Sequence, residues 1–158
     1  MQFFSMSEGI LGIILGAFLG GGLQLITTII QRRHEARTMR VALACEVDAT
    51  CRLIRFQKYE EGILSLLKSV ETSPDQVTTV ILDARSDYFT VFTAMAARLG
   101  ILGSAEVADL VRFHSYCKSA IDSVRMDGPF SGDVASEDSR ANLENLLDLV
   151  RTILSLVD

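Results

Sequence analysis

The chain has 158 residues, of which 49% are hydrophobic and 22% charged, with 15 basic and 20 acidic side chains. This composition excludes an intrinsically disordered chain, and the length suits one small domain with an appendage. The charges are distributed unevenly: no Lys or Arg precedes Arg32, and Glu8 is the one acid before it. The amino-terminal end is therefore predominantly apolar.

A run of 22 residues without a charge, containing six Ile and five Leu, extends from Gly9 to Ile30. A helix needs about 20 apolar residues to cross the hydrocarbon core of a bilayer. A cleavable signal peptide would have a basic start and a shorter apolar region, of about 7–15 residues. We therefore expect a retained transmembrane helix over residues 9–31, preceded by a short extracytoplasmic tail over residues 1–8.

Four arginines follow the apolar run directly, whereas no basic residue precedes it: Arg32, Arg33, Arg37 and Arg40. Basic residues accumulate on the cytoplasmic side of membrane helices, so we expect the carboxy-terminal part of the chain in the cytoplasm and the amino terminus outside. The same side chains stop transfer through the membrane and can contact anionic lipid headgroups.

Small and polar residues of the apolar run share one helical face, which has the spacing of a glycine zipper: Gly9, Gly12, Gly16, Gly20, Gln24 and Thr27. Bulky residues such as Phe18 lie on the opposite face. Lipid solvates bulky apolar side chains well, whereas a glycine face lets a second backbone approach closely. This face predicts packing against another membrane helix, from a second copy or from another protein. The alternative is that the glycines are frequent in membrane helices and their spacing is accidental.

Residues 32–72 continue the helical periodicity without a strong breaker, with Gly62 as a weak point rather than an end. One apolar stripe of this juxtamembrane helix consists of Met39, Leu43, Val47 and Ile54. A second apolar stripe lies roughly opposite, so the helix is either enclosed in its own domain or shared with a partner. The first stripe is the candidate partner surface.

Residues 73–158 contain the remaining amphipathic segments. Residues 76–84 are rich in Val, Ile and Thr, and we expect them to be helical or irregular. A helix after Asp87 is expected to end with Gly100 in the left-handed conformation.

We expect Ser104 to cap the next helix, with Glu106 in its first turn. A mobile loop over residues 127–140 then precedes a regular helix that begins near Leu143. Together these elements predict an all-α chain, with one transmembrane helix followed by a small cytoplasmic helical bundle.

Few residues in the chain could carry out chemistry. His34 lies in the basic flank, and His114 lies within an apolar stripe, where a packing role is more common than a switch. Three scattered cysteines are expected to be small buried hydrophobes. The histidines and cysteines lack metal-ligand spacing, and beyond Arg40 the 18 acids outnumber 11 bases. We therefore expect no enzyme activity, cofactor, metal or nucleic-acid partner, and no small-molecule substrate is evident.

The stretch from Tyr88 to Asp122 resembles part of a loose group of uncharacterised bacterial single-pass membrane proteins with a cytoplasmic helical domain. The resemblance rests on Leu99-Gly100-Ile101-Leu102 and on Val111-Arg112-Phe113-His114. The group prefers an aromatic residue at the position of His114, which favours a packing role. The resemblance implies a bacterial source, and hence the inner membrane, but no activity.

These observations predict a non-enzymatic, single-pass protein of the inner membrane. Its glycine-rich helix would make it a homo-oligomer, or an accessory or scaffold subunit of a larger membrane complex. The alternative is an oligomeric pore- or lesion-forming protein, in which Gln24, Thr27 and Thr28 are the polar groups available to line the pore.

Overall fold

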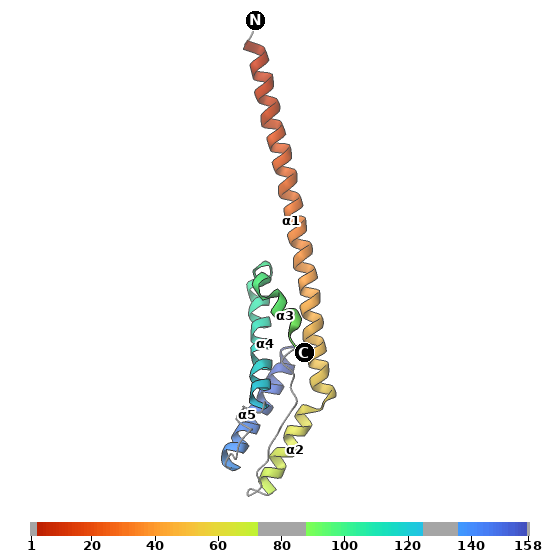
Figure 1. Cartoon of the computed structure of the whole chain (residues 1–158), viewed down its shortest axis with the longest axis vertical. Coiled ribbons are helices and arrows are strands. Elements are labelled where there is room, and N and C mark those ends of the chain that lie inside the picture. The colour runs from red at the N-terminus through yellow and green to blue at the C-terminus, as the bar shows by residue number, and fades with distance from the viewer. Residues whose placement is uncertain (1–2, 73–87, 125–135, 158) are drawn as a thin grey trace. The chain divides into compact units, whose positions relative to one another are not determined.

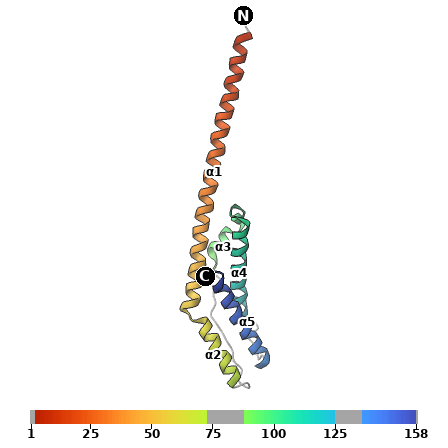
Figure 2. The ribbon, with the colours of Figure 1, turned by 180° about the vertical axis from the view of Figure 1, so that it is seen from behind.

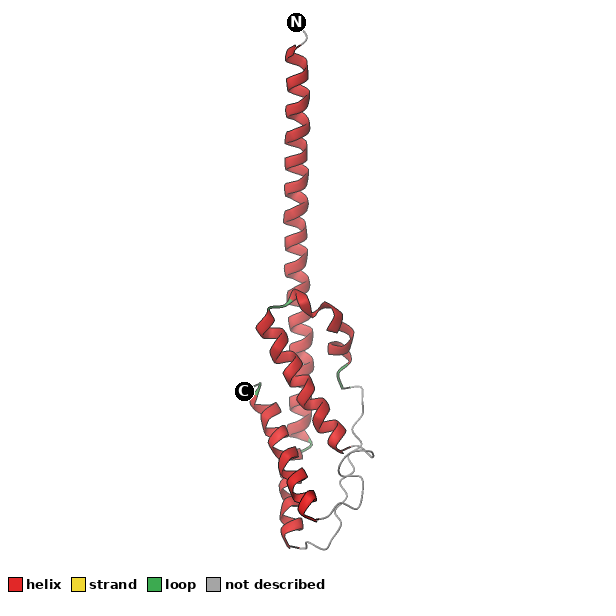
Figure 3. Ribbon diagram, turned by 90° about the vertical axis from the view of Figure 1, so that its left-hand side faces the viewer, coloured by secondary structure: helices red, strands yellow, loops and turns green. Residues whose placement is uncertain are grey.

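The computed structural model describes residues 3–72, 88–124 and 136–157, and it describes side chains from Gly16 onward and, after the last gap, from Asp138. Throughout these ranges the regular elements are helices (Figure 3), which confirms the all-α prediction. The elements are α1 (Phe3–Phe56), α2 (Tyr59–Thr72), α3 (Thr90–Met95), the 3-10 helix η1 (Ala96–Ile101), α4 (Ser104–Val124) and α5 (Ser136–Ser155).

The chain divides into two compact units, Met1–Arg40 and Val41–Asp158, and the boundary falls inside α1. The first unit consists of the amino-terminal part of α1 alone. Within the part of the chain that the structure describes, no helix is both long enough and apolar enough to cross a membrane.

The second unit is a helical bundle in which α5 lies beside both α2 and α4 (Figures 1 and 2). One face of α5 is buried at the spacing of three and four that the sequence predicts: Leu143, Leu146, Leu147, Val150 and Ile153. The first four of these side chains pack with Ile63 and Val70 of α2 and with Val124 of α4. A second part of the core joins Cys51 of α1 to Phe113 and Cys117 of α4 and Ile153 of α5.

The long helix breaks after Phe56, before Gly62, the weak point that the sequence indicates. Lys58 has a φ of 53°, a left-handed conformation that a residue with a side chain seldom adopts. Gly62 is an ordinary helical residue whose N–H donates to the Lys58 carbonyl at 2.9 Å. The break lets α2 leave the axis of α1 and bury Ile63 and Val70 against α5.

Two helix boundaries between α3 and α4 also differ from the prediction. Gly100 lies within η1 and has no positive φ, so it is not the left-handed cap. Leu99 and Leu102 are both buried, and their spacing of three matches the 3-10 period.

The start of α4 differs because Ser104 is already helical. The Glu106 carboxylate accepts the Gly103 N–H at 2.9 Å, which is the reciprocal half of a capping box. The expected loop over residues 127–140 extends too far, because α5 begins at Ser136 and residues 136–140 are therefore helical. Its residues 127–135, like residues 76–84, lie outside the described ranges.

Candidate functional site

A buried acid–histidine pair joins α1 to α4. The Nε2 of His114 lies 3.4 Å from Oε2 of Glu46, and the two side chains are 5% and 7% exposed. The Glu46 carboxylate also accepts the backbone N–H groups of Val91, at 2.7 Å, and Phe92, at 2.9 Å. Since Val91 and Phe92 belong to α3, one carboxylate connects three helices.

The contact of His114 with the Leu110 carbonyl oxygen shows that Nδ1 of the imidazole carries a proton. Nδ1 lies 2.7 Å from the Leu110 carbonyl oxygen, and a carbonyl oxygen only accepts, so Nδ1 is the donor. Nε2, on the other side of the ring, faces Oε2 of Glu46 at 3.4 Å.

Three phenylalanine rings surround the His114 imidazole. Phe92 stacks on it with ring centroids 3.7 Å apart, while Phe89 and Phe113 approach edge-on at 5.0 and 5.3 Å. This enclosure excludes water and strengthens the polar contacts inside it. A dissolved substrate cannot reach a pair so enclosed, so the arrangement suits holding helices together rather than acid–base catalysis.

The sequence indicates the packing role of His114 but not its partner, Glu46. The spacing of Glu46 from its neighbours on α1 does indicate that its side chain is buried. Glu46 lies three residues after the buried Leu43 and four before the half-buried Thr50, so it occupies the core-facing side of α1. A charge at such a position requires a buried partner.

The residues of the predicted glycine face are described in part. Gly9 and Gly12 lie outside the side chains that the structure describes. At Gly16 and Gly20 an added Cβ would meet no atom within 4 Å, so within this chain the space beside both glycines is open. Gln24 and Thr27 are exposed, and the Thr27 hydroxyl donates to the Leu23 carbonyl at 2.8 Å.

The four arginines after the apolar run, Arg32, Arg33, Arg37 and Arg40, are all exposed on α1. Their expected role at lipid headgroups or as a stop-transfer signal stays a prediction. The position of the bilayer relative to them stays a prediction.

The candidate partner stripe is largely a core surface, which corrects the expectation. Leu43 is 1% exposed, and Val47 and Ile54 pack against the buried core of the second unit. Their periodicity therefore matches the packing of the chain's own domain, in which Leu43 is buried and Val47 and Ile54 are half-buried. Met39 belongs to the other unit.

The sequence predicts that all three cysteines are buried, and this prediction is wrong for one of them. Cys51 and Cys117 are buried, but Cys45 is exposed, and no disulfide joins any of these three residues. Burial raises the pKa of the Cys117 thiol to about 12, with the nearby Cys51 as a second cause. In the described part of the chain no three His, Cys, Asp or Glu residues gather as metal ligands.

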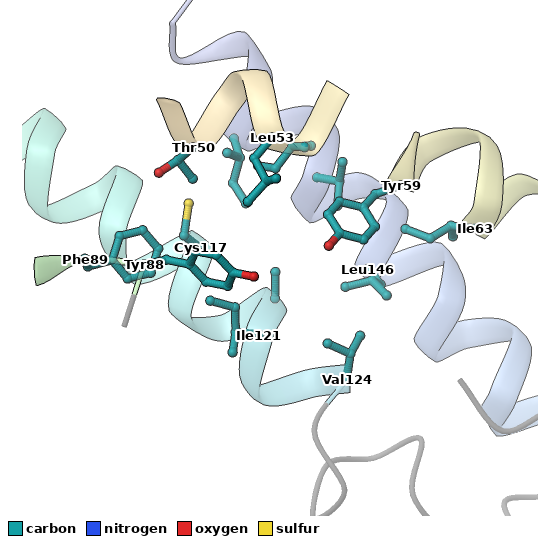
Figure 4. A pocket seen from close by; sticks show the side chains of 14 residues that line it. Thr50, Leu53, Tyr59, Ile63, Tyr88, Phe89, Cys117, Ile121, Val124 and Leu146 are labelled. Carbon is teal, nitrogen blue, oxygen red and sulfur yellow. The ribbon is translucent and has the colours of Figure 1, made fainter. Parts of the chain in front are cut away.

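A cavity of about 90 Å³ lies between α1, α2, α4 and α5, and Figure 4 shows its lining. None of its 14 lining side chains is charged. Leu, Ile, Val, Ala and Phe make up most of the wall, and the remaining side chains are those of Thr50, Tyr59, Tyr88 and Cys117. Burial raises the pKa of the Tyr59 phenol, and Tyr88 raises it further.

No family model, no curated protein and no solved structure matches this chain. The resemblance of Tyr88–Asp122 to a group of bacterial membrane proteins therefore stays an expectation.

Proposed function

We propose that the protein is a non-enzymatic, single-pass membrane protein anchored by the amino-terminal part of α1. One observation carries the proposal. Seven large apolar side chains within 13 residues of this helix are between 44% and 80% exposed: Phe18, Leu19, Leu23, Leu25, Ile26, Ile29 and Ile30. A contiguous apolar surface of this kind requires a cover other than water, and lipid is the cover that suits bulky apolar side chains over half the circumference of a helix.

The length of the span depends on residues that precede the described side chains. Gly16 to Ile30 covers 15 residues, or about 22 Å of helix, which falls short of a hydrocarbon core of about 30 Å. With residues 9–15, which are Gly, Ile and Leu, the run reaches 22 residues, or about 33 Å. The proposal therefore rests on the whole run in the sequence.

The hydroxyls at the end of the run support a lipid environment. Thr27 donates to Leu23 and Thr28 donates to Gln24, each to a backbone oxygen at 2.8 Å. Hydroxyls that bond their own helix need no water. A pore would therefore depend mainly on Gln24, so we favour an accessory or scaffold role, or a homo-oligomer, over the pore-forming alternative.

The glycine face supplies the interaction surface of this proposed role. Gly16 and Gly20 leave room beside α1 for a second backbone, and close backbone approach is the main source of affinity between membrane helices. Gln24 on the same face can hydrogen-bond across such an interface. The partner is then a helix of a second copy or of a larger complex in a bacterial inner membrane.

Alkaline extraction of membranes tests the anchor. The full-length chain should stay in the membrane pellet, while a variant with Leu19→Arg and Leu23→Arg should be released, because each central arginine costs about 2.5–3.5 kcal/mol on insertion. The matched control carries Val41→Arg and Val111→Arg, two exposed apolar positions outside the run. Release of the wild-type chain, or equal release of both variants, would contradict the proposal.

Cys45 tests the orientation because it is the exposed thiol among the three cysteines. A membrane-impermeant maleimide should leave it unmodified in intact spheroplasts and modify it after permeabilisation. A Cys45→Ser variant provides the background. Labelling of Cys45 in intact spheroplasts would place the second unit outside the cytoplasm.

A further inference from the structure

We propose that the cavity between α1, α2, α4 and α5 binds a small, neutral, apolar molecule that carries one hydrogen-bonding oxygen. The site lies in the second unit, so it is independent of the proposed membrane anchor. An alicyclic alcohol of about seven non-hydrogen atoms represents the chemical class.

The size of the ligand follows from the volume. A cavity of about 90 Å³ is smaller than the cavity of about 150 Å³ that encloses a benzene ring, so it encloses about four non-hydrogen atoms. Because the cavity is open on one side, the remaining atoms of a seven-atom ligand lie in its mouth. Its lining is mostly aliphatic, with Leu53, Ile63 and Ile121 among the contributors (Figure 4). An apolar lining of this kind favours apolar molecules over water.

The polarity of the ligand follows from two tyrosines. Figure 4 shows the Tyr59 and Tyr88 hydroxyl oxygens pointing into the same space from different sides of the cavity. A tyrosine phenol is protonated at neutral pH, and burial raises the pKa of Tyr59 further above its ordinary value of 10.0, so this hydroxyl can donate a hydrogen bond or accept one. An oxygen on the ligand would bond there, while the rest of the ligand contacts aliphatic side chains.

The absence of lining charge selects against ions. Among the lining residues that the structure describes there is no Lys, Arg or His, so against these side chains a buried carboxylate would lose its hydration without gaining a cation. A neutral alcohol loses far less. The cavity should therefore discriminate between molecules of the same shape that differ in charge.

The test uses the full chain in lipid nanodiscs, with methyl resonances of Ile63, Ile121 and Val124 as the readout. Three probes of similar size are titrated: cyclohexanol, methylcyclohexane and cyclohexanecarboxylate. Cyclohexanol should produce saturable shifts of the cavity methyls. Methylcyclohexane should bind up to about tenfold more weakly for want of the hydrogen bond, and the carboxylate more weakly still.

Two variants locate the binding. Ala120→Leu places three extra carbons in the cavity and should remove the saturable shifts, whereas Ala108→Leu, at an exposed position of the same helix, should not. Tyr59→Phe keeps the volume and should lower the cyclohexanol affinity to that of methylcyclohexane, because it removes the phenol that bonds the ligand oxygen. The absence of saturable shifts, equal affinity for the carboxylate, or unchanged binding in Ala120→Leu would overturn the proposal, whatever the outcome of the membrane extraction.

Discussion

Glu46 and His114 are 68 residues apart in the chain, yet Nε2 of His114 lies 3.4 Å from Oε2 of Glu46 in an enclosure that leaves both side chains less than a tenth exposed. The contact joins α1 to α4, and the same carboxylate accepts two backbone N–H groups of α3. A buried pair is costly to break because the remaining partner stays desolvated. The pair should therefore contribute to stability as a unit.

A double-mutant cycle on Glu46 and His114 measures this coupling. Glu46→Ala leaves two backbone donors and one imidazole without a partner and should cost about 3–5 kcal/mol. His114→Phe preserves the stacking on Phe92 and should cost about 1–2 kcal/mol. The double variant should be more stable than the sum of the two losses predicts, by about 1–2 kcal/mol. Denaturation followed by circular dichroism gives the four values, and strict additivity would show that the pair is not coupled.

Leu43 distinguishes a core role from a partner-binding role for its stripe on α1. Because Leu43 is 1% exposed, Leu43→Ala should lower the free energy of unfolding by about 2–5 kcal/mol in the purified chain. Val41→Ala, at a position two residues away that is 58% exposed, should change it by about 0.5 kcal/mol or less. Unchanged stability of Leu43→Ala would restore the stripe as a candidate partner surface.

Cys117 should make stability depend on alkaline pH. Its pKa of about 12 in the folded chain exceeds the ordinary value of 9.0, so between these pH values the unfolded thiol ionises while the folded thiol keeps its proton. Stability therefore falls as the pH rises through this window, by up to about 1.4 kcal/mol per pH unit.

Comparison with Cys117→Ala isolates this contribution from the titration of Lys and Tyr. The stability difference between the wild-type chain and the variant should shift by about 2 kcal/mol against the wild type from pH 8 to pH 10.5. Parallel pH profiles of the two proteins would show that the Cys117 thiol is not protected from ionisation.

Gly16 and Phe18 test the glycine face against the bulky face of the same helix. Gly16→Ile puts a branched side chain where a second backbone would approach, so it should weaken helix association by tenfold or more, about 1.4 kcal/mol, without preventing insertion. Phe18→Ile should leave association unchanged because lipid accepts both side chains. Crosslinking yield in native membranes measures both, and equal effects would mean that the glycines face lipid.

The sequence predicts most of the elements whose periodicity is strong. The face of α5 from Leu143 to Ile153 is buried as its spacing of three and four indicates, because a regular amphipathic helix has one way to bury its apolar side. His114 also lies in the core, with a partner, as its place in an apolar stripe suggests.

The features that the sequence does not reveal depend on tertiary contacts. The break at Lys58 has no Pro or Gly to mark it, and the packing of α2 against α5 determines where the helix ends. The spacing places Glu46 on the core-facing side of α1, but it does not identify His114, 68 residues away, as its partner. The Met39, Leu43, Val47 and Ile54 stripe shows the same limit, since periodicity identifies an apolar face but not what covers it.

The exposure of Leu19 to lipid is the most direct test of the membrane proposal. Leu19 is 69% exposed and Val41 is 58% exposed. If neither lipid nor another protein covered them, both side chains would be in contact with water. Spin labels attached at Leu19→Cys and at Val41→Cys, each in a Cys45→Ala chain reconstituted in vesicles, are compared for collision with oxygen and with a polar nickel complex. If lipid surrounds Leu19, the label at position 19 should collide often with oxygen and rarely with the nickel complex. The label at position 41 should collide more often with the nickel complex than with oxygen. Ready collision of the nickel complex with the label at position 19 would contradict the membrane anchor, and protection from both reagents would mean that protein, and not lipid, covers this part of α1.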